Sequence, residues 1–209
     1  KGSSYVVNIN KCTHAGFAAG KFTNDTLFNV EGAENVTVYV DGKKWDSTGI
    51  FVAEDGTKYY SNTTGLDIAL EEAQAGDVIN LLPGEFAPKS YKAGVKLIGT
   101  SAEEVKVNVE GKKFGLGGGD VYIENVTLKF ANVNYTGFQH TGNEIYKNCV
   151  IEGQPFLYGN NVTFETCTFK QTSSDWYNVW TYGAKNVTFN NCVLNSAGKS
   201  VLVYTESGS

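Results

Sequence analysis

Aromatic side chains are concentrated in one short stretch of this sequence. Trp176, Tyr177, Trp180 and Tyr182 lie close together, with Asp175 and Asn178 among them. Aromatic faces beside Asn, Gln and Asp hold sugar rings, through apolar contact combined with hydrogen bonds. Alternation along a strand lets only about half of the rings face outward. The alternative is that the inward rings fill the core and the outward rings form an ordinary aromatic stack between neighbouring repeats. The candidate ligand-binding residues are Tyr135, His140, Tyr158, Trp176, Tyr177, Trp180 and Tyr182.

His140 is the residue best suited to acid–base chemistry, because an imidazole titrates near neutral pH. The alternative is an ordinary surface or half-buried histidine bonded to a neighbour. Three glutamates, Glu124, Glu144 and Glu165, are expected to lie near one bend as a solvated row. We therefore assign no catalytic residue, and the absence of any Cys-x-x-Cys pair gives no reason to expect a metal or cofactor.

The charge of the chain argues against some classes of binding partner. The formal net charge is −5, and all 17 basic residues are lysines. Without arginine there is no bidentate fork for phosphate, and an acidic chain is a poor match for nucleic acid or an anionic membrane. No apolar run reaches the length of a transmembrane helix, so no membrane insertion is expected.

A repeated phrase gives the primary evidence for the fold. Asn161-Val-Thr-Phe-Glu-Thr-Cys167 returns 25 residues later as Asn186-Val-Thr-Phe-Asn-Asn-Cys192. Apolar residues at alternate positions predict short strands with one buried face. Recurrence at this period predicts a solenoid, in which each repeat stacks on its neighbour.

Aligning the copies predicts two ladders. Val126, Cys149, Cys167 and Cys192 share one position, and Cys12 is a fifth candidate in the N-terminal copy. We expect small, buried, free side chains there, with one disulfide between adjacent repeats as the alternative. The residues at the preceding bend are Asn125, Asn148, Thr166 and Asn191. Asn tolerates left-handed backbone, so stacked side chains should link successive bends.

Four of the seven Asn-x-Ser/Thr sequons are the same Asn-Val-Thr phrase. Several of them must lie in packed repeats, so we interpret the sequons as strand and bend chemistry rather than as glycosylation sites.

One helix is predicted, from Leu66 to Ala73, with Thr63 or Thr64 as its N-cap and Gly76 ending it. Ala-Gly-Asp-Val-Ile-Asn-Leu-Leu-Pro-Gly-Glu-Phe follows at 75–86, and Val-Lys-Leu-Ile-Gly at 95–99. This succession resembles the entry to the right-handed parallel β-helix domains of the pectin lyase-like superfamily. The resemblance implies an all-β solenoid whose short N-terminal helix caps its open end.

The resemblance is limited to the fold. Pectate lyases of this superfamily use clustered Asp for calcium and commonly an Arg as base, whereas this chain has no Arg and few Asp in the predicted repeats. The fold also carries esterases, hydrolases, tailspikes and adhesins, so it does not identify the reaction.

The predicted organisation is a strand-rich segment at 1–64 followed by the β-helix at 65–209. An open end after the last repeat would expose an unpaired edge and a section of the core. Because residues 5–14 match the repeat, we expect residues 1–45 to complete the C-terminal repeats, within one molecule or between copies. Head-to-tail self-association through the ends is the corresponding partner prediction.

The leading functional hypothesis is a non-catalytic binding or adhesion module of a secreted or cell-surface, bacterial protein, which recognises a glycan or surface protein through its aromatic face. One alternative is a polysaccharide lyase or hydrolase of the pectate lyase-like type. The other is a structural spacer in a repetitive surface protein.

Overall fold

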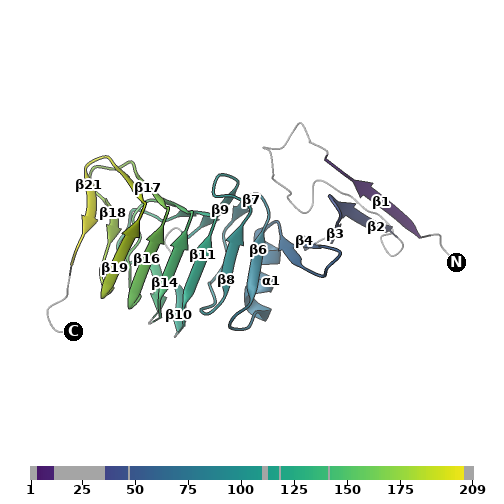
Figure 1. Cartoon of the computed structure of the whole chain (residues 1–209), viewed down its shortest axis with the longest axis horizontal. Coiled ribbons are helices and arrows are strands. Elements are labelled where there is room, and N and C mark those ends of the chain that lie inside the picture. The colour runs from purple at the N-terminus through teal and green to yellow at the C-terminus, as the bar shows by residue number, and fades with distance from the viewer. Residues whose placement is uncertain are drawn as a thin grey trace.

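The computed structural model describes residues 4–11, 36–46, 48–109, 113–117, 119–140 and 142–204, with the backbone alone at 113–117, 139 and 140. Figure 1 shows a long row of strands, with the N-terminal strands at one end and β19 and β21 at the other. A short helix lies beside β6.

The largest sheet has 11 strands, and its spatial order follows their order in the chain. The strands are β1 (Tyr5–Ile9), β2 (Val36–Val40), β3 (Lys43–Trp45), β4 (Ile50–Val52), β5 (Lys58–Tyr60), β6 (Val78–Leu81), β8 (Lys96–Gly99), β11 (Val121–Glu124), β14 (Glu144–Lys147), β16 (Asn161–Glu165) and β19 (Asn186–Asn190).

A second sheet has six strands, all paired in parallel. They are β7 (Gly84–Phe86), β9 (Val105–Asn108), β12 (Thr127–Lys129), β15 (Val150–Glu152), β17 (Thr168–Gln171) and β20 (Val193–Ser196). Two smaller parallel pairs are β10 (Lys113–Gly117) with β13 (Gly137–His140) and β18 (Tyr177–Trp180) with β21 (Lys199–Leu202).

From β6 onward, each strand of the large sheet is followed in the chain by one strand of the six-stranded sheet. We call each such succession a repeat. The strands of both sheets advance together, always in parallel, from one repeat to the next. Within the described residues, the expectation of a β-rich chain with long parallel sheets and one short helix is confirmed.

The register of these strands places equivalent residues directly against each other. Val162 pairs with Val187, and Phe164 pairs with Phe189. The rings of Tyr146, Phe164 and Phe189 consequently stack, with centroid separations of 4.8 and 5.3 Å and nearly parallel planes. The alternation seen in the repeated phrase therefore separates a buried face from an exposed one.

The predicted ladder of small residues is confirmed for its four described members. Val126, Cys149 and Cys167 are buried, and Cys192 is half-buried. The three thiols are free, and the Cys167 Sγ lies 3.3 Å from the carbonyl oxygen of Tyr146 in the preceding repeat. Cys12 lies outside the described residues, so its place in the ladder stays a prediction.

The predicted left-handed bend is present in every described copy. Asn125, Asn148, Thr166 and Asn191 have φ values of 56°, 49°, 55° and 51°. The side-chain ladder is shorter than expected: among the described residues the bend side chains are linked once, from Asn148 Nδ2 to Asn125 Oδ1, at 3.3 Å. Thr166 interrupts it, since a threonine side chain has no amide.

Helix α1 (Thr63–Glu72) begins one residue after its N-cap, Asn62. The Asn62 side chain accepts a hydrogen bond from the backbone N–H of Gly65 at 2.8 Å, so the prediction of Thr63 or Thr64 as the cap was wrong. The helix buries Leu66, Ala69 and Leu70 against the core, as their spacing predicted.

The N-terminal strands do not complete the C-terminal repeats within one molecule. β1 pairs with β2 at the edge of the large sheet opposite β19. Three antiparallel pairs join β2 to β5, and a parallel pair joins β5 to β6, so β1 and β2 run opposite to the later strands. The local match of β1 to the repeat did not reveal this partner, because pairing is decided by residues distant in sequence. Completion between copies stays a prediction.

We predict that Thr166→Asn stabilises the protein. A β-branched side chain in left-handed backbone is strained by ~1–2 kcal/mol, and Asn tolerates this conformation better. The free energy of unfolding in urea should rise by about 1 kcal/mol. The matched control is Thr163→Asn in β16, where extended backbone disfavours Asn and a small loss is expected. A similar loss at both positions would contradict the prediction.

Candidate functional site

Aromatic rings from four successive segments meet beside the β18–β21 sheet. Phe156 forms a parallel bridge with Trp180, and the segments that contain Tyr135 and Tyr204 flank these strands. We call the resulting set of rings the aromatic cluster. Its members are Tyr135, Phe156, Tyr158, Trp180, Tyr182 and Tyr204.

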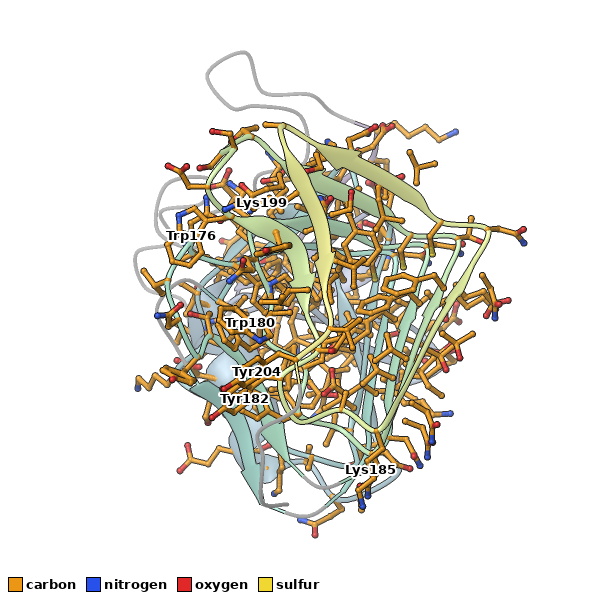
Figure 2. The ribbon with its side chains drawn as sticks, turned by 90° about the vertical axis from the view of Figure 1, so that its left-hand side faces the viewer. Trp176, Trp180, Tyr182, Lys185, Lys199 and Tyr204 are labelled. Atoms are coloured by element: carbon orange, nitrogen blue, oxygen red, sulfur yellow. The ribbon has the colours of Figure 1, made fainter. Side chains whose placement is uncertain are left out.

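Tyr182 is the centre of the cluster. Its ring centroid lies 5.4 Å from that of Tyr135 and 5.5 Å from that of Tyr158, both edge-on. It stacks on Tyr204 at 6.1 Å with an interplanar angle of 10°. Figure 2 shows Trp180, Tyr182 and Tyr204 close together on one side of the molecule.

The cluster has a buried base and an exposed rim. Phe156 is 1% exposed and stacks on Trp180, with their centroids 4.5 Å apart. Trp180, Tyr182 and Tyr158 are half-buried. Tyr135 and Tyr204 are 46% and 42% exposed, so a ligand would meet these two rings first.

Trp176 and Tyr177 do not join this cluster. Within the described residues, neither ring lies against a ring of the cluster, and Figure 2 places Trp176 apart from Trp180 and Tyr204. Tyr177 instead lies beneath the ammonium group of Lys199, 5.4 Å from its ring centroid. The Lys199 Nζ also donates to the carbonyl oxygen of Asp175 at 3.0 Å. Of the seven predicted residues, the structure therefore brings Tyr135, Tyr158, Trp180 and Tyr182 together and leaves Trp176 and Tyr177 outside the cluster.

The structure describes the backbone of His140 alone. The residue ends β13 and pairs with Gly117 of β10. Its predicted role in ligand binding stays a prediction.

Buried amides hold the first residue of β18. The Gln154 Oε1 accepts from the Tyr177 N–H at 2.8 Å, and the Gln171 Nε2 donates to the Tyr177 carbonyl at 3.0 Å. Gln171 also exchanges hydrogen bonds with Asn132. The start of β18 is thus held by Gln154, which follows β15 in the preceding repeat, and by Gln171, which ends β17 directly before β18 in the chain. Sequence reasoning missed these amides because their residue type gives no sign of burial.

A second polar ladder, also missed from the sequence, runs along the start of the large-sheet strands. The Asn161 Nδ2 donates to Asn143 Oδ1 at 2.7 Å, and Asn186 Nδ2 donates to Asn161 Oδ1 at 2.9 Å. At the end of this ladder opposite Asn186, the Asp120 side chain accepts a hydrogen bond from the backbone N–H of Asn143. The signal was the recurring Asn at the first strand position. The side-chain amides of the sequon residues Asn161 and Asn186 are therefore engaged in hydrogen bonds within the protein, although both residues are exposed.

The three glutamates do not form the expected row. Glu124 and Glu165 end their strands, but Lys147 lies between them in register. Glu144 begins β14 and is fully buried, so its placement in a solvated row was wrong. Its carboxylate accepts from the Tyr146 hydroxyl at 2.5 Å and from the Gly159 N–H at 2.9 Å. These bonds give the buried carboxylate a structural role.

Among the described residues, no three or more His, Cys, Asp or Glu side chains come together in a way that could hold a metal ion. Over the same residues, no helix has the length and apolar character needed to cross a bilayer. Comparison with protein-family models, with curated proteins and with solved structures gave no match for this chain.

We predict that Trp176 and Trp180, which are both half-buried, differ in their contribution to stability. Trp180→Ala removes a ring stacked on Phe156 and should lower the free energy of unfolding by about 3 kcal/mol. Trp180→Phe keeps the stack and should cost less than about 1.5 kcal/mol. Trp176→Ala should cost less than about 1 kcal/mol. Urea unfolding at neutral pH measures all three, and equal losses at Trp176 and Trp180 would contradict the assignment.

We also predict a loss of stability at alkaline pH that depends on Tyr146. Burial raises the pKa of Tyr146 well above its usual value, and the charge of Glu144 and the hydrogen bond to it raise it further. Above pH ~10 the tyrosine ionises in the unfolded chain and stays neutral in the folded one, so stability is kept below that pH and lost above it. In the wild type, ionisation of Tyr146 makes the free energy of unfolding fall as the pH rises. Tyr146→Phe should make this fall less steep by about 1.4 kcal/mol per pH unit between pH 10 and 12. Equal slopes for the two proteins in urea titrations would contradict this.

Proposed function

We propose that this chain is a right-handed parallel β-helix of the pectin lyase-like type that serves as a glycan-binding module. The strand order supports the architectural part of this proposal. Each segment from β6 onward passes from the large sheet to the six-stranded sheet, and the next segment pairs with it in parallel and in register. Parallel strands that advance by one position per repeat are what a coil stacked on a coil requires.

The observation that carries the functional proposal is the graded exposure of the aromatic cluster. Tyr135 and Tyr204 present exposed rings, and both contact Tyr182. Their positions are set by packing against buried Phe156 and half-buried Trp180, so they lose little freedom when a ligand binds. Rigid aromatic faces with an apolar body and a polar hydroxyl suit the apolar face and the hydroxyl groups of a sugar ring.

In this proposal the module belongs to a secreted or cell-surface protein, where it serves adhesion without catalysis. A surface glycan held along several repeats would contact rings from successive segments at once, which increases avidity. Pairing of the exposed β1 edge with another copy would add a second route to multivalency.

A glycan array tests the proposal with the wild-type chain and two rim variants, Tyr135→Ala and Tyr204→Ala. We expect the wild type to bind at least one class of glycan. Each variant should weaken binding about tenfold, which corresponds to ~1.4 kcal/mol.

The matched control is Tyr5→Ala, because Tyr5 is a 61% exposed tyrosine on β1 at the other end of the large sheet. This variant should bind as the wild type does. Failure of the wild type to bind any glycan would overturn the proposal, as would binding that survives both rim substitutions.

A further inference from the structure

The large sheet has a free edge at each end, formed by β1 and β19 (Figure 1). Within the described residues, each of these strands pairs on one side only. Both strands lead into a left-handed residue, Lys11 with a φ of 49° and Asn191 with a φ of 51°. In each, a valine lies four residues before the bend, and an isoleucine or phenylalanine lies two residues before it. The two edges therefore share this bend and the same apolar pattern.

Neither edge strand carries the charged residues or prolines with which natural proteins protect a free edge. β1 is Tyr-Val-Val-Asn-Ile, and β19 is Asn-Val-Thr-Phe-Asn. Val7 is 43% exposed, and Val187 and Phe189 are half-buried. The equivalents of the last two in the preceding repeat, Val162 and Phe164, are each 1% exposed. A further strand in register would bury the apolar residues of both edges.

The apolar side chains of β1 lie on the face of the large sheet away from the main core. Tyr60 of β5 pairs with Leu81 and shares the main core, so its neighbour Tyr59 faces outward. Paired residues share a face, and the outward face runs from Tyr59 through β4 and β3 to Val40 and Ile9. These outward residues form a separate small core cluster.

Strand direction decides which face a second copy offers to β1. β1 runs opposite to β6 and to the later strands. If β1 of one copy pairs in parallel with β19 of another, the repeats of the two copies run in opposite directions along one continuous sheet. Two copies of one protein have the same hand, so their main cores then lie on opposite faces of that sheet. The outward face of β1 is therefore the core face of its partner, whereas antiparallel pairing would place it outside.

The free backbone groups fit the same parallel register. Backbone groups alternate along a strand, so those not bonded to the neighbour face the free edge. On β1 these belong to Val6 and Asn8, because the Ile9 carbonyl accepts from the residue that follows β2. On β19 they include those of Val187, because the first and last residues of that strand bond to the preceding repeat. Bonding of Val187 to Val6 and Asn8 places Val7 directly opposite it.

We propose that the chain associates with a second copy of itself, β1 of one molecule pairing in parallel with β19 of the other. Val7 lies against Val187, and the two left-handed bends coincide. The contact continues the interface that joins β16 to β19. It is heterologous, so it builds open chains of molecules rather than closed dimers. It uses no ring of the aromatic cluster, so this proposal and glycan binding can fail independently.

Sedimentation equilibrium of the full chain tests the contact. The weight-average mass should rise above the monomer mass of 22.6 kDa as the protein concentration is raised, and species larger than a dimer should appear. A protein that remains monomeric up to about 1 mM would overturn the proposal, because any contact would then be weaker than ~4 kcal/mol.

Val7→Lys and Val187→Lys each block one edge, because each places a charge among side chains that the contact buries. Each variant alone should associate at least about tenfold more weakly than the wild type. An equimolar mixture should form dimers and nothing longer, because each variant keeps the edge that the other lacks. Normal association of Val187→Lys alone would show that β1 pairs elsewhere and would overturn the assignment of β19.

Val6→Lys is the matched control. Val6 precedes Val7, is 61% exposed and faces the other side of the strand, so a lysine there stays in solvent. Its association should remain within about twofold of the wild type. A loss as large as that of Val7→Lys would contradict the face assigned to β1. Urea unfolding checks that each variant is folded, and dimer formation in the mixture shows that both blocked variants retain an intact edge.

Discussion

Parallel pairing in register is the constraint on which the rest of this structure depends. Once Val162 lies against Val187, every later residue of those strands must lie against its equivalent. The side chain at each position must therefore pack against the side chain at the equivalent position of the next repeat. Rings therefore stack on rings and thiols on thiols, and the left-handed bends recur at one position. Charged residues do not repeat at the equivalent position. Lys147 lies between Glu124 and Glu165 in register, so the two glutamates do not make a like-charge contact.

The features that could be predicted from the sequence are those determined by residues within a single repeat. Alternation and the bend residues are local, so the copies ending at Cys149, Cys167 and Cys192 could be aligned without a structure. The failures have a common cause. Glu144 was placed by its distance from other glutamates, yet its position at the start of a strand decides that it is buried. The pairing of β1 with β2 depends on a partner about 30 residues away, which no local pattern specifies.

The candidate site was predictable in composition but not in arrangement. The aromatic strands were recognisable, whereas the division between Trp180 in the cluster and Tyr177 beside Lys199 depends on which face each residue occupies. Phe156 is the ring on which Trp180 stacks, and nothing in its sequence neighbourhood distinguishes it from an ordinary core phenylalanine. Burial of the amides of Gln154 and Gln171 is likewise a property of neighbouring repeats.

The two-residue pairing of β5 with β6 has a mechanical consequence. Backbone hydrogen bonds between neighbouring strands point along the row, so a pull between its two ends loads the strand pairs in series. The pairs with the fewest bonded residues then yield first. β14 with β16 has four paired positions and β16 with β19 has five, whereas β5 with β6 has two, as do β2 with β3 and β3 with β4. Tension would therefore separate strand pairs between β2 and β6 before it opened the stacked repeats.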